Sequence, residues 1–451
     1  MESIQYKPLG AVSEALYVLE TEHCPRSGYT AVIFRGRPDP EAFKKAVDRV
    51  ISDMPSLACK LEERKVGLQY RLFRVPVENP GLEFRDDFAH GLKGRTISQA
   101  MNEYFEPTYL RGLDIFCEAA GRFHLFRFPD DVGALALFNH HIAADGSTLI
   151  SIFRNVFAAY HEVVTGLAPE WAKAEALPSS IAREVPSASA GPVLSDMFSE
   201  GRARAKNPVL RFGRDVQITS AKRNIVSFRL TEDETRQAAK KAKAKGLTVN
   251  DLLSVAIVRG VDDIMGSPEG TLSLWIPVNA RAISAGQEDR SNLSTSISID
   301  LIRLDRVNED RLAEKIVSRR KYLLSRGHDV VSIRLLEKLL GIAYYFPVRM
   351  RTPRLRKLMT RPTTIMSSNF GILWPRMENG RPTIDSFMTH AGGLEILDYE
   401  VNFSTVDSVG HGIVAYTFRG RLKANFSAYE QTMDRRDAER FMERVRLHML
   451  D

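Results

Sequence analysis

The 451-residue chain has little cysteine and no long apolar run. Its three cysteines, Cys24, Cys59 and Cys117, form no CxxC pair, and an odd number argues against a disulfide framework. No uninterrupted apolar run reaches the length of a membrane span, and residues 1–10 lack the charged-then-apolar pattern of a signal peptide. We therefore expect a cytoplasmic protein with no transmembrane segment, and peripheral contact with a membrane stays open.

Length and composition indicate an ordinary globular protein of two domains. Hydrophobic residues make up 44% of the chain and charged residues 26%. A chain of this length exceeds one typical core, and residues 180–195 are rich in Ser, Ala and Pro, as linkers are. We predict an N-terminal lobe over residues 1–180, a linker or crossover over 181–220, and a C-terminal lobe over 221–451.

A basic run between residues 349 and 361 accounts for part of the net charge of +7, and no acidic residue interrupts it. It is either a solvated helix end or a docking patch for an acidic partner: a carrier protein, the phosphates of coenzyme A, or a membrane surface. Nucleic acid is disfavoured, because no nucleic-acid-binding module is visible and aromatic residues do not interleave with the run. The candidate docking residues are Arg349, Arg351, Arg354, Arg356 and Lys357.

Titratable groups are packed most closely in an HHxxxDG run at residues 140–146. The apolar stretch 133–138 predicts a buried strand that leads into this run. Apolar residues at helical spacing over 149–164 predict a helix that leads out, and Gly166 is positioned to end that helix. The two histidines therefore lie in a tight strand-to-helix turn, which holds side chains rigidly beside a cleft.

A neutral imidazole can accept a proton from an attacking hydroxyl, amine or thiol. Because neighbours in an extended turn point to opposite sides, only one of His140 and His141 can face a reaction. Asp145 could orient that imidazole, or could hold the turn by pairing with an arginine. Gly146 permits positive φ or a close backbone approach, and the free N–H groups of the helix start favour developing negative charge.

The surroundings of the run suggest no protein nucleophile and no metal site. There is no GxSxG motif and no nearby cysteine, and HExxH or His-x3-His spacing is absent. A base without a protein nucleophile fits direct attack of an acceptor on an activated acyl donor in a ternary complex.

Strand and helix signals recur in the same order in both halves of the chain. In the first half, a strand is predicted at 29–34, followed by a helix with Asp39 as its cap and Pro40 at its first position. In the second half, a strand at 224–230 precedes a Thr231 to Glu234 capping box. Further signals predict a helix from about 248, strands near 394–406 and 411–420, and a closing helix from about 434. This pattern predicts two similar lobes, each a sheet covered by helices.

With these features, the chain resembles the HHxxxDG acyltransferase superfamily, which contains chloramphenicol acetyltransferase, nonribosomal peptide condensation domains and polyketide-associated acyltransferases. The motif at 140–146 matches the signature in full, and YTAVIFRG, GLTVNDLLSVAIVRGV, WIPVNAR and SSNFG agree more weakly. The run NFGIL departs from the DFGWG of the plant branch, and the PLW motif of wax ester synthases is absent. The resemblance implies an α/β (α+β) fold of two chloramphenicol-acetyltransferase-like lobes, each a mixed sheet covered by helices, with an active-site channel between them.

The resemblance also implies roles for individual residues. His141 matches the general base and His140 a more structural position, while Asp145 matches an aspartate that forms a salt bridge, here with Arg281. The residues that would line the channel or stabilise an oxyanion are Gly146, Ser368, Asn369 and Gly371. The implied co-substrate is an acyl-CoA or a phosphopantetheinyl carrier protein, with no permanently bound cofactor and no metal.

We therefore predict a monomeric acyltransferase of natural-product or lipid biosynthesis that moves an acyl group from a thioester to a hydroxyl or amine. Two alternatives remain: a free-standing amide-forming condensation enzyme, and a non-catalytic carrier-recognition module.

Overall fold

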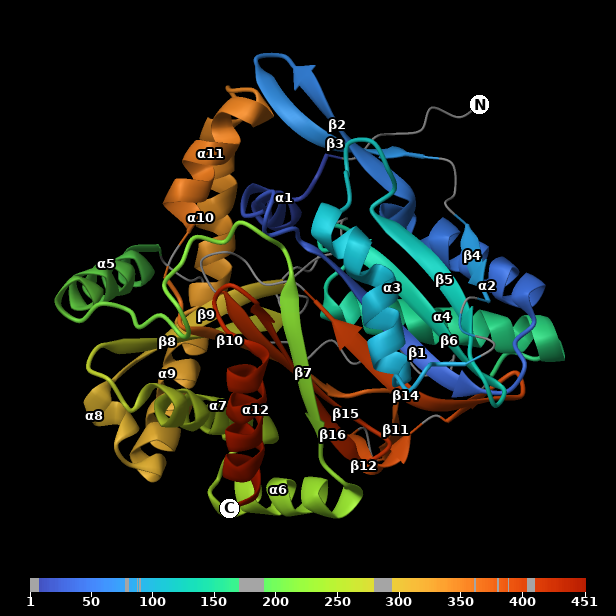
Figure 1. The fold of residues 1–451 in the computed structure, drawn as a ribbon. Helices are drawn as coiled ribbons and strands as arrows, with labels where there is room; N and C mark the ends of the chain where they lie inside the picture. Colours follow the sequence, from blue (N-terminus) through green and yellow to red (C-terminus); the bar gives the residue numbers. More distant parts are fainter. Residues whose placement is uncertain are drawn as a thin grey trace.

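A computed structural model describes residues 8–77, 81–86, 88, 91–169, 190–279, 294–360, 362–378, 381–387, 389–403 and 410–451. Its strands form two six-stranded sheets and two short two-stranded ribbons. The two large sheets lie side by side as two lobes, and helices cover both of them (Figure 1). The predicted α/β architecture of two lobes is confirmed.

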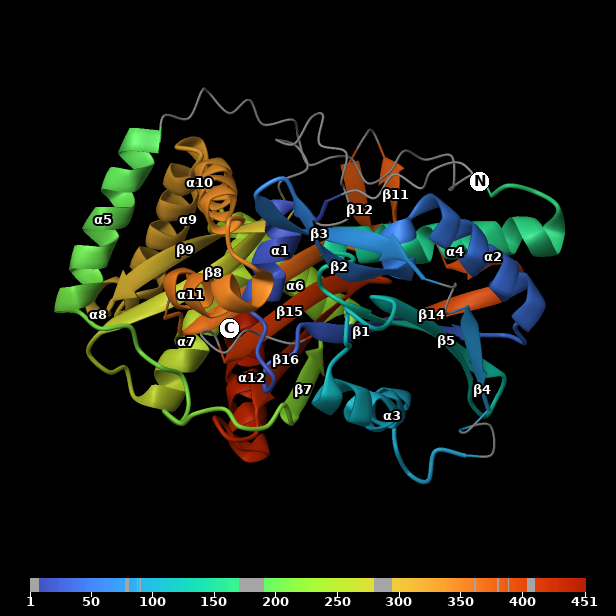
Figure 2. The ribbon, with the colours of Figure 1, turned by 90° about the horizontal axis from the view of Figure 1, so that it is seen from above.

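The first sheet is built around β1, which pairs antiparallel with β6 on one side and with β14 on the other. Helices α2 (Pro40–Asp53) and α4 (Gly146–Thr165) lie on one side of this sheet and α3 (Ile97–Arg111) on the other (Figure 2). The strands, in order across the sheet, are β13 (His390–Ala391), β14 (Leu394–Asn402), β1 (Ser27–Arg35), β6 (Val132–His140), β5 (Gly121–Arg127) and β4 (Leu82–Arg85).

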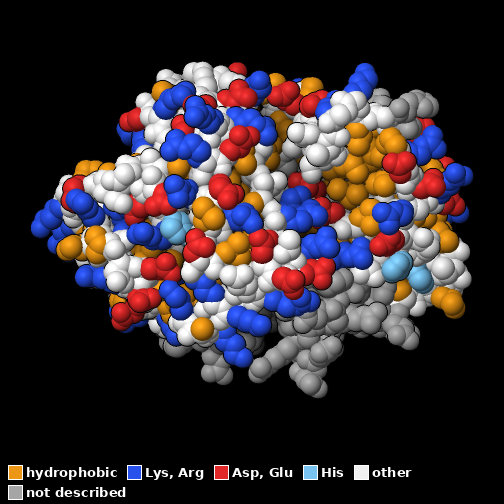
Figure 3. All heavy atoms as spheres, turned by 60° about the horizontal axis from the view of Figure 1, so that its bottom comes forward, with side chains coloured by type: hydrophobic (Ala, Val, Ile, Leu, Met, Phe, Trp, Pro, Cys, Tyr) orange, Lys and Arg blue, Asp and Glu red, His pale blue; other side chains and the backbone are white. Residues whose placement is uncertain are grey.

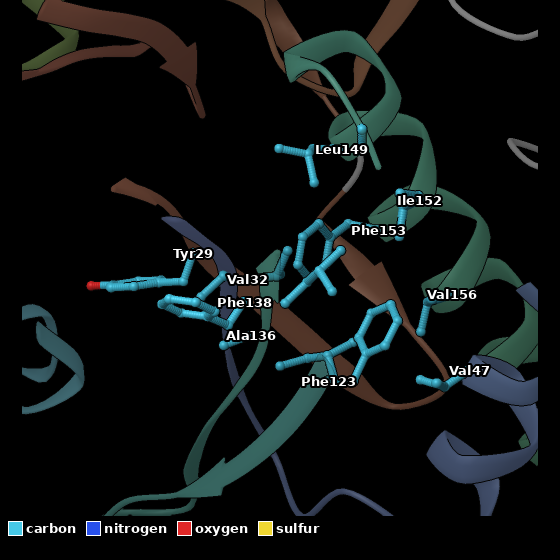
Figure 4. Close-up of a cluster of buried hydrophobic side chains, with 14 of the residues drawn as sticks. Tyr29, Val32, Val47, Phe123, Ala136, Phe138, Leu149, Ile152, Phe153 and Val156 are labelled. Atoms are coloured by element: carbon cyan, nitrogen blue, oxygen red, sulfur yellow. The ribbon is translucent and has the colours of Figure 1, made fainter. Parts of the chain in front are cut away.

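The core of the first lobe forms where the apolar stripe of α4 packs on the sheet (Figure 4). Phe153 of this helix is fully buried, and its ring lies 6.5 Å from that of Phe123 on β5 and 5.9 Å from that of Tyr399 on β14. The predicted start of α2 is confirmed, because Pro40 is its first residue and the Asp39 side chain caps it. The Phe153 side chain thus joins α4 to strands from both halves of the chain.

The second sheet carries its own core, under helices α6 (Glu232–Ala244), α7 (Val249–Met265), α9 (Glu309–Ser325) and α12 (Arg435–Leu450). The predicted cap of α6 is confirmed, since Thr231 forms a capping box. The predicted start of α7 is confirmed as well, and Thr248 forms a capping box there that was not predicted. The strands, in order, are β7 (Arg223–Arg229), β16 (Arg421–Tyr429), β15 (His411–Phe418), β10 (Ile365–Ile372), β8 (Thr271–Asn279) and β9 (Ser294–Ile302).

Two segments of the second half of the chain cross over to the first lobe. Strands β13 and β14 complete the first sheet, although residues 221–451 were predicted to form the second lobe alone. Helices α10 (His328–Ala343) and α11 (Val348–Met359) lie against α1 (Ala11–Val18), and the Tyr70 amide donates to the carbonyl of Tyr344 at 2.6 Å (Figure 1). Alternation predicts that a segment is a strand, but it does not specify which sheet edge that strand completes.

The remaining elements are short or peripheral. Residues 190–206 of the predicted linker form helix α5, and residues 180–189 lie outside the described residues. In the described part of the chain, no helix combines the length and the apolar character needed to cross a bilayer. These elements are α5 (Ala190–Lys206), α8 (Arg303–Arg306), η1 (Pro55–Ala58), and the ribbons β2 (Cys59–Val66) with β3 (Gln69–Pro76) and β11 (Pro375–Glu378) with β12 (Arg381–Phe387).

Replacing Phe153 with alanine should lower the free energy of unfolding by about 3–5 kcal/mol, because it leaves a cavity between α4 and the first sheet. Val163 lies on the same helix and is 42% exposed, so Val163→Ala should change that energy by less than about 0.5 kcal/mol. Urea unfolding followed by circular dichroism measures both changes. Equal unfolding midpoints for the two variants would contradict the packing described for α4.

Candidate active site

The HHxxxDG run forms the predicted turn between β6 and α4. Strand β6 ends at His140, and α4 begins at Gly146. Asp145 is the N-cap of α4, and its Oδ1 accepts a hydrogen bond from the Thr148 amide at 2.9 Å. Its predicted partner Arg281 lies outside the described residues.

His140 is fully buried and serves to hold the turn. Its Nδ1 accepts a hydrogen bond from the Ile142 amide at 3.1 Å, so the proton of the neutral ring sits on Nε2. That Nε2–H donates to Glu20 Oε2 at 2.9 Å. Burial raises the pKa of Glu20, but His140 and the Arg26 amide outweigh burial and keep it below its ordinary value. The carboxylate is therefore available to orient the ring.

The carbonyls of the turn also have hydrogen-bond donors from distant segments. The Ile142 carbonyl accepts from Ser13 Oγ at 3.3 Å and from Arg74 Nη2 at 3.1 Å. The Ala143 carbonyl accepts from Ser56 Oγ at 3.1 Å. With its polar groups paired in this way, the buried turn has one well-defined conformation.

His141 points to the other side of the turn, into a cavity of about 580 Å³ between the two lobes. Its amide donates to the Arg26 carbonyl at 2.7 Å. Burial and then the positive charge of Arg26 lower the pKa of His141 to about 4, although Asp145 acts in the opposite direction. The imidazole is therefore neutral near pH 7, in the form that accepts a proton.

The cavity is bounded by β1, β6 and α4 of the first lobe, by β8, β9 and β10 of the second, and by α1, α10 and α11. Its surface away from His141 is largely apolar, which suits a hydrocarbon group. The larger apolar lining residues include Leu16, Leu19, Leu149, Leu336, Leu339, Met359, Met366 and Phe370.

Gly146 lies where the two lobes meet. A Cβ at this position would lie 2.4 Å from Cε1 of Phe370 on β10, so glycine is required by the close approach of that ring. The neighbouring Ser147 Oγ accepts a hydrogen bond from Asn279 Nδ2, at the end of β8, at 3.2 Å. The start of α4 is thus in contact with the second lobe at two points.

The predicted channel residues separate into two groups. Gly146 and Ser368 line the cavity, and Phe370 does so as well. Asn369 and Gly371 are absent from the described lining residues, because side chains alternate along β10, and Asn369 Oδ1 accepts from the Gly371 amide at 2.8 Å. The prediction for these two positions is therefore corrected.

Only part of the basic run is exposed at the surface. Arg351 is 2% exposed, forms an ion pair with Glu14, and donates to the Tyr70 carbonyl at 2.7 Å. Arg356 Nε donates to the Val18 carbonyl at 2.9 Å, which ties α11 to α1. Burial thus removes Arg351 from the predicted docking set and gives Arg356 a structural contact. The exposed members are Arg349, Arg354 and Lys357.

The face of the molecule in Figure 3 carries no single-sign field of charge. Lys and Arg are interspersed with Asp and Glu over most of it, and apolar side chains gather in one hollow.

Among the described residues, no three His, Cys, Asp or Glu side chains are grouped so that they could hold a metal ion.

No protein-family model and no curated protein sequence matches the chain. Solved structures do match over nearly the whole length. Trichothecene 15-O-acetyltransferase TRI3 from Fusarium sporotrichioides aligns at TM-score 0.70 and 13% identity, covering 99% of this chain and 94% of that one. The first condensation domain of the calcium-dependent antibiotic synthetase aligns at TM-score 0.69 and 14% identity, covering 100% and 97%.

The starter condensation domain of rhizomide synthetase, solved with C8-CoA, aligns at TM-score 0.65 and 14% identity, covering 99% of this chain and 95% of that one. The chain therefore has the fold of the condensation domains and chloramphenicol-acetyltransferase-like acyltransferases, which confirms the resemblance at the level of structure.

Sequence reasoning did not find Glu20 or Arg26, because neither belongs to a motif and both reach the site only through tertiary contacts.

Replacing Gly146 with alanine should lower the free energy of unfolding by about 1–3 kcal/mol, because the new methyl group overlaps the Phe370 ring. In a Phe370→Ala background the same change should cost much less, which a double-mutant cycle by urea unfolding measures. Gly341 lies in α10, and a Cβ added there would meet nothing within 4 Å, so Gly341→Ala should be neutral or stabilising. Additive costs for Gly146→Ala and Phe370→Ala would show that the two residues do not constrain each other.

Proposed function

We propose that the protein is an acyltransferase that moves an acyl group from a coenzyme A or carrier-protein thioester to a hydroxyl or amine acceptor. The observation that carries the proposal is His141, a buried neutral imidazole that faces a cavity between two lobes. Such a cavity has room for a donor and an acceptor to meet at one base. The shared fold with acyltransferases and condensation domains supports the same conclusion.

In the proposed reaction, the acceptor gives its proton to the imidazole of His141 as its oxygen or nitrogen attacks the thioester carbonyl carbon. The new bond produces a tetrahedral oxyanion. When that intermediate collapses, the carbon–sulfur bond breaks, and the departing thiolate takes the proton from the imidazolium. The reaction needs no covalent acyl-enzyme, and no described lining residue is a cysteine.

We expect two groups to assist the oxyanion. The start of α4 at Gly146 and the hydroxyl of Ser368 both line the cavity, and donors directed at developing negative charge lower the barrier. Asp145 caps α4 and favours the protonated form of His141, so it stabilises the imidazolium that forms during the reaction.

The donor enters as a co-substrate, not as a resident cofactor. Exposed Arg349, Arg354 and Lys357 on α11 could bind either coenzyme A phosphates or an acidic carrier. A condensation reaction between carrier-bound substrates is the second candidate, and the likeness to a condensation domain solved with a substrate analogue favours it.

His141→Ala should lower kcat by about 10²–10⁴-fold, because the base is lost while the cavity remains. Free-thiol release from a panel of acyl-CoAs, and intact-mass detection of acyl-carrier proteins, each with alcohol and amine acceptors, measures the loss and identifies the donor. His390 is exposed at the edge of the first sheet, so His390→Ala is the matched control and should keep full turnover. Turnover that survives in His141→Ala would remove this residue from the mechanism.

With a hydroxyl acceptor, kcat/KM should be nearly constant from about pH 5 to 8 and should fall only as pH approaches about 4. The sign follows from the lowered pKa of His141: the neutral base dominates above that pKa and is lost below it. Circular dichroism at each pH separates loss of the base from acid unfolding. An acid limb near pH 6.5 in the folded protein would show that the imidazole is not held in its neutral form.

A further inference from the structure

Arg26 lies directly across from the proposed base. It precedes β1, and the register that pairs Ser27 with His140 places Arg26 opposite His141. The His141 amide donates to the Arg26 carbonyl at 2.7 Å, which fixes this alignment. Side chains directly opposite each other in an antiparallel pair stand on the same side, with Cβ atoms about 4.5–5.5 Å apart. Both residues line the cavity.

The guanidinium of Arg26 is buried, and its hydrogen-bonding capacity is not filled by the described residues. The residue is 5% exposed, and its Nε is buried with no hydrogen-bond partner. The Glu20 carboxylate, whose charge acts on Arg26, accepts hydrogen bonds from the Arg26 amide at 3.0 Å and from His140 at 2.9 Å, and no hydrogen bond joins it to the guanidinium among the described residues. Because a buried charge is costly unless it is paired, this arrangement points to a ligand that supplies the anion.

The charges around the cavity indicate which anion fits. Among the described lining residues, Arg26 is the only arginine or lysine. His141 is neutral, and His328 bonds to Asp196 at 2.9 Å. The lining carboxylate of Glu200 forms an ion pair with Arg319, so it does not neutralise Arg26. One guanidinium balances one negative charge and offers two parallel N–H donors, which matches a carboxylate better than a doubly charged phosphate.

The position of Arg26 indicates which substrate carries that carboxylate. The base contacts the nucleophile of the acceptor, and Arg26 is the neighbour of that base across the strand pair. A carboxylate held by Arg26 therefore lies within a few atoms of the attacking oxygen or nitrogen. The rest of the cavity is walled by apolar residues of α1, α10 and α11, against which hydrocarbon groups can pack.

We propose that Arg26 binds a carboxylate of the acceptor, so that the acceptor is a hydroxy acid or amino acid with an apolar side chain. This inference rests on the proposed acyl transfer and names the class of acceptor for the same site.

The test compares 3-phenyllactate with its methyl ester as acceptors, using the acyl-CoA that gives the highest turnover dependent on His141. At pH 8, where His141 is neutral with or without Arg26, the wild-type protein should prefer the free acid by about tenfold or more in kcat/KM. Arg26→Met should remove the preference by weakening turnover of the acid alone, and Arg26→Lys should keep part of it. Arg35 is an exposed arginine on the same strand, so Arg35→Met should leave the preference intact.

Equal turnover of acid and ester by the wild-type protein would overturn the inference. Equal losses for acid and ester in Arg26→Met, with an unchanged unfolding midpoint, would also overturn it and assign Arg26 to the oxyanion. Calorimetric titration of 3-phenyllactate into His141→Ala tests the site without turnover. Binding that disappears in the His141→Ala, Arg26→Met double variant supports the carboxylate site even if no thioester is consumed, so failure of the proposed function and failure of this inference give different results.

Discussion

The rest of the site depends on the burial of the turn between β6 and α4. Water cannot reach the backbone of a buried turn, so its amides and carbonyls must be paired within the protein. Ser13, Ser56 and Arg74 donate hydrogen bonds to its carbonyls, and the His140 ring accepts a hydrogen bond from one of its amides. These partners come from three separate segments of the first lobe. The direction of His141 is therefore determined by packing around the turn and not by the turn sequence alone.

The same turn joins the two lobes. The start of α4 leaves room for the Phe370 ring at Gly146 and bonds to the end of β8 through Ser147. In the other direction, β14 completes the first sheet from the second half of the chain, and Arg351 of α11 is buried against Glu14 of α1. Each lobe thus buries part of the other. These contacts fix the positions of the two lobe surfaces that enclose the cavity. His141, at this junction, lines a cavity to which both lobes contribute residues.

The sequence predicted what local chemistry controls and missed what depends on distant contacts. Caps and apolar periodicity located the starts of α2, α6 and α7 and the C-terminal end of α4, because the residues that signal a helix end also make hydrogen bonds there. The crossing of β14 could not be predicted, because an alternating strand fits any open sheet edge. Arg351 looked like a surface cation in a basic run, since its partner Glu14 is more than three hundred residues away. Asn369 was placed on the wrong side because strand register sets the facing of each side chain.

The charges beside the base link acceptor binding to base strength. Burial and the Arg26 cation keep His141 neutral but also make it a weak base, with a pKa of about 4. A carboxylate bound to Arg26 offsets that cation, so the pKa of His141 rises towards its ordinary value. The imidazole then accepts a proton more readily, and it does so only when the acceptor is in place. A base closer in pKa to the working pH transfers protons more efficiently, so the arrangement favours reaction with the acceptor over hydrolysis of the thioester by water.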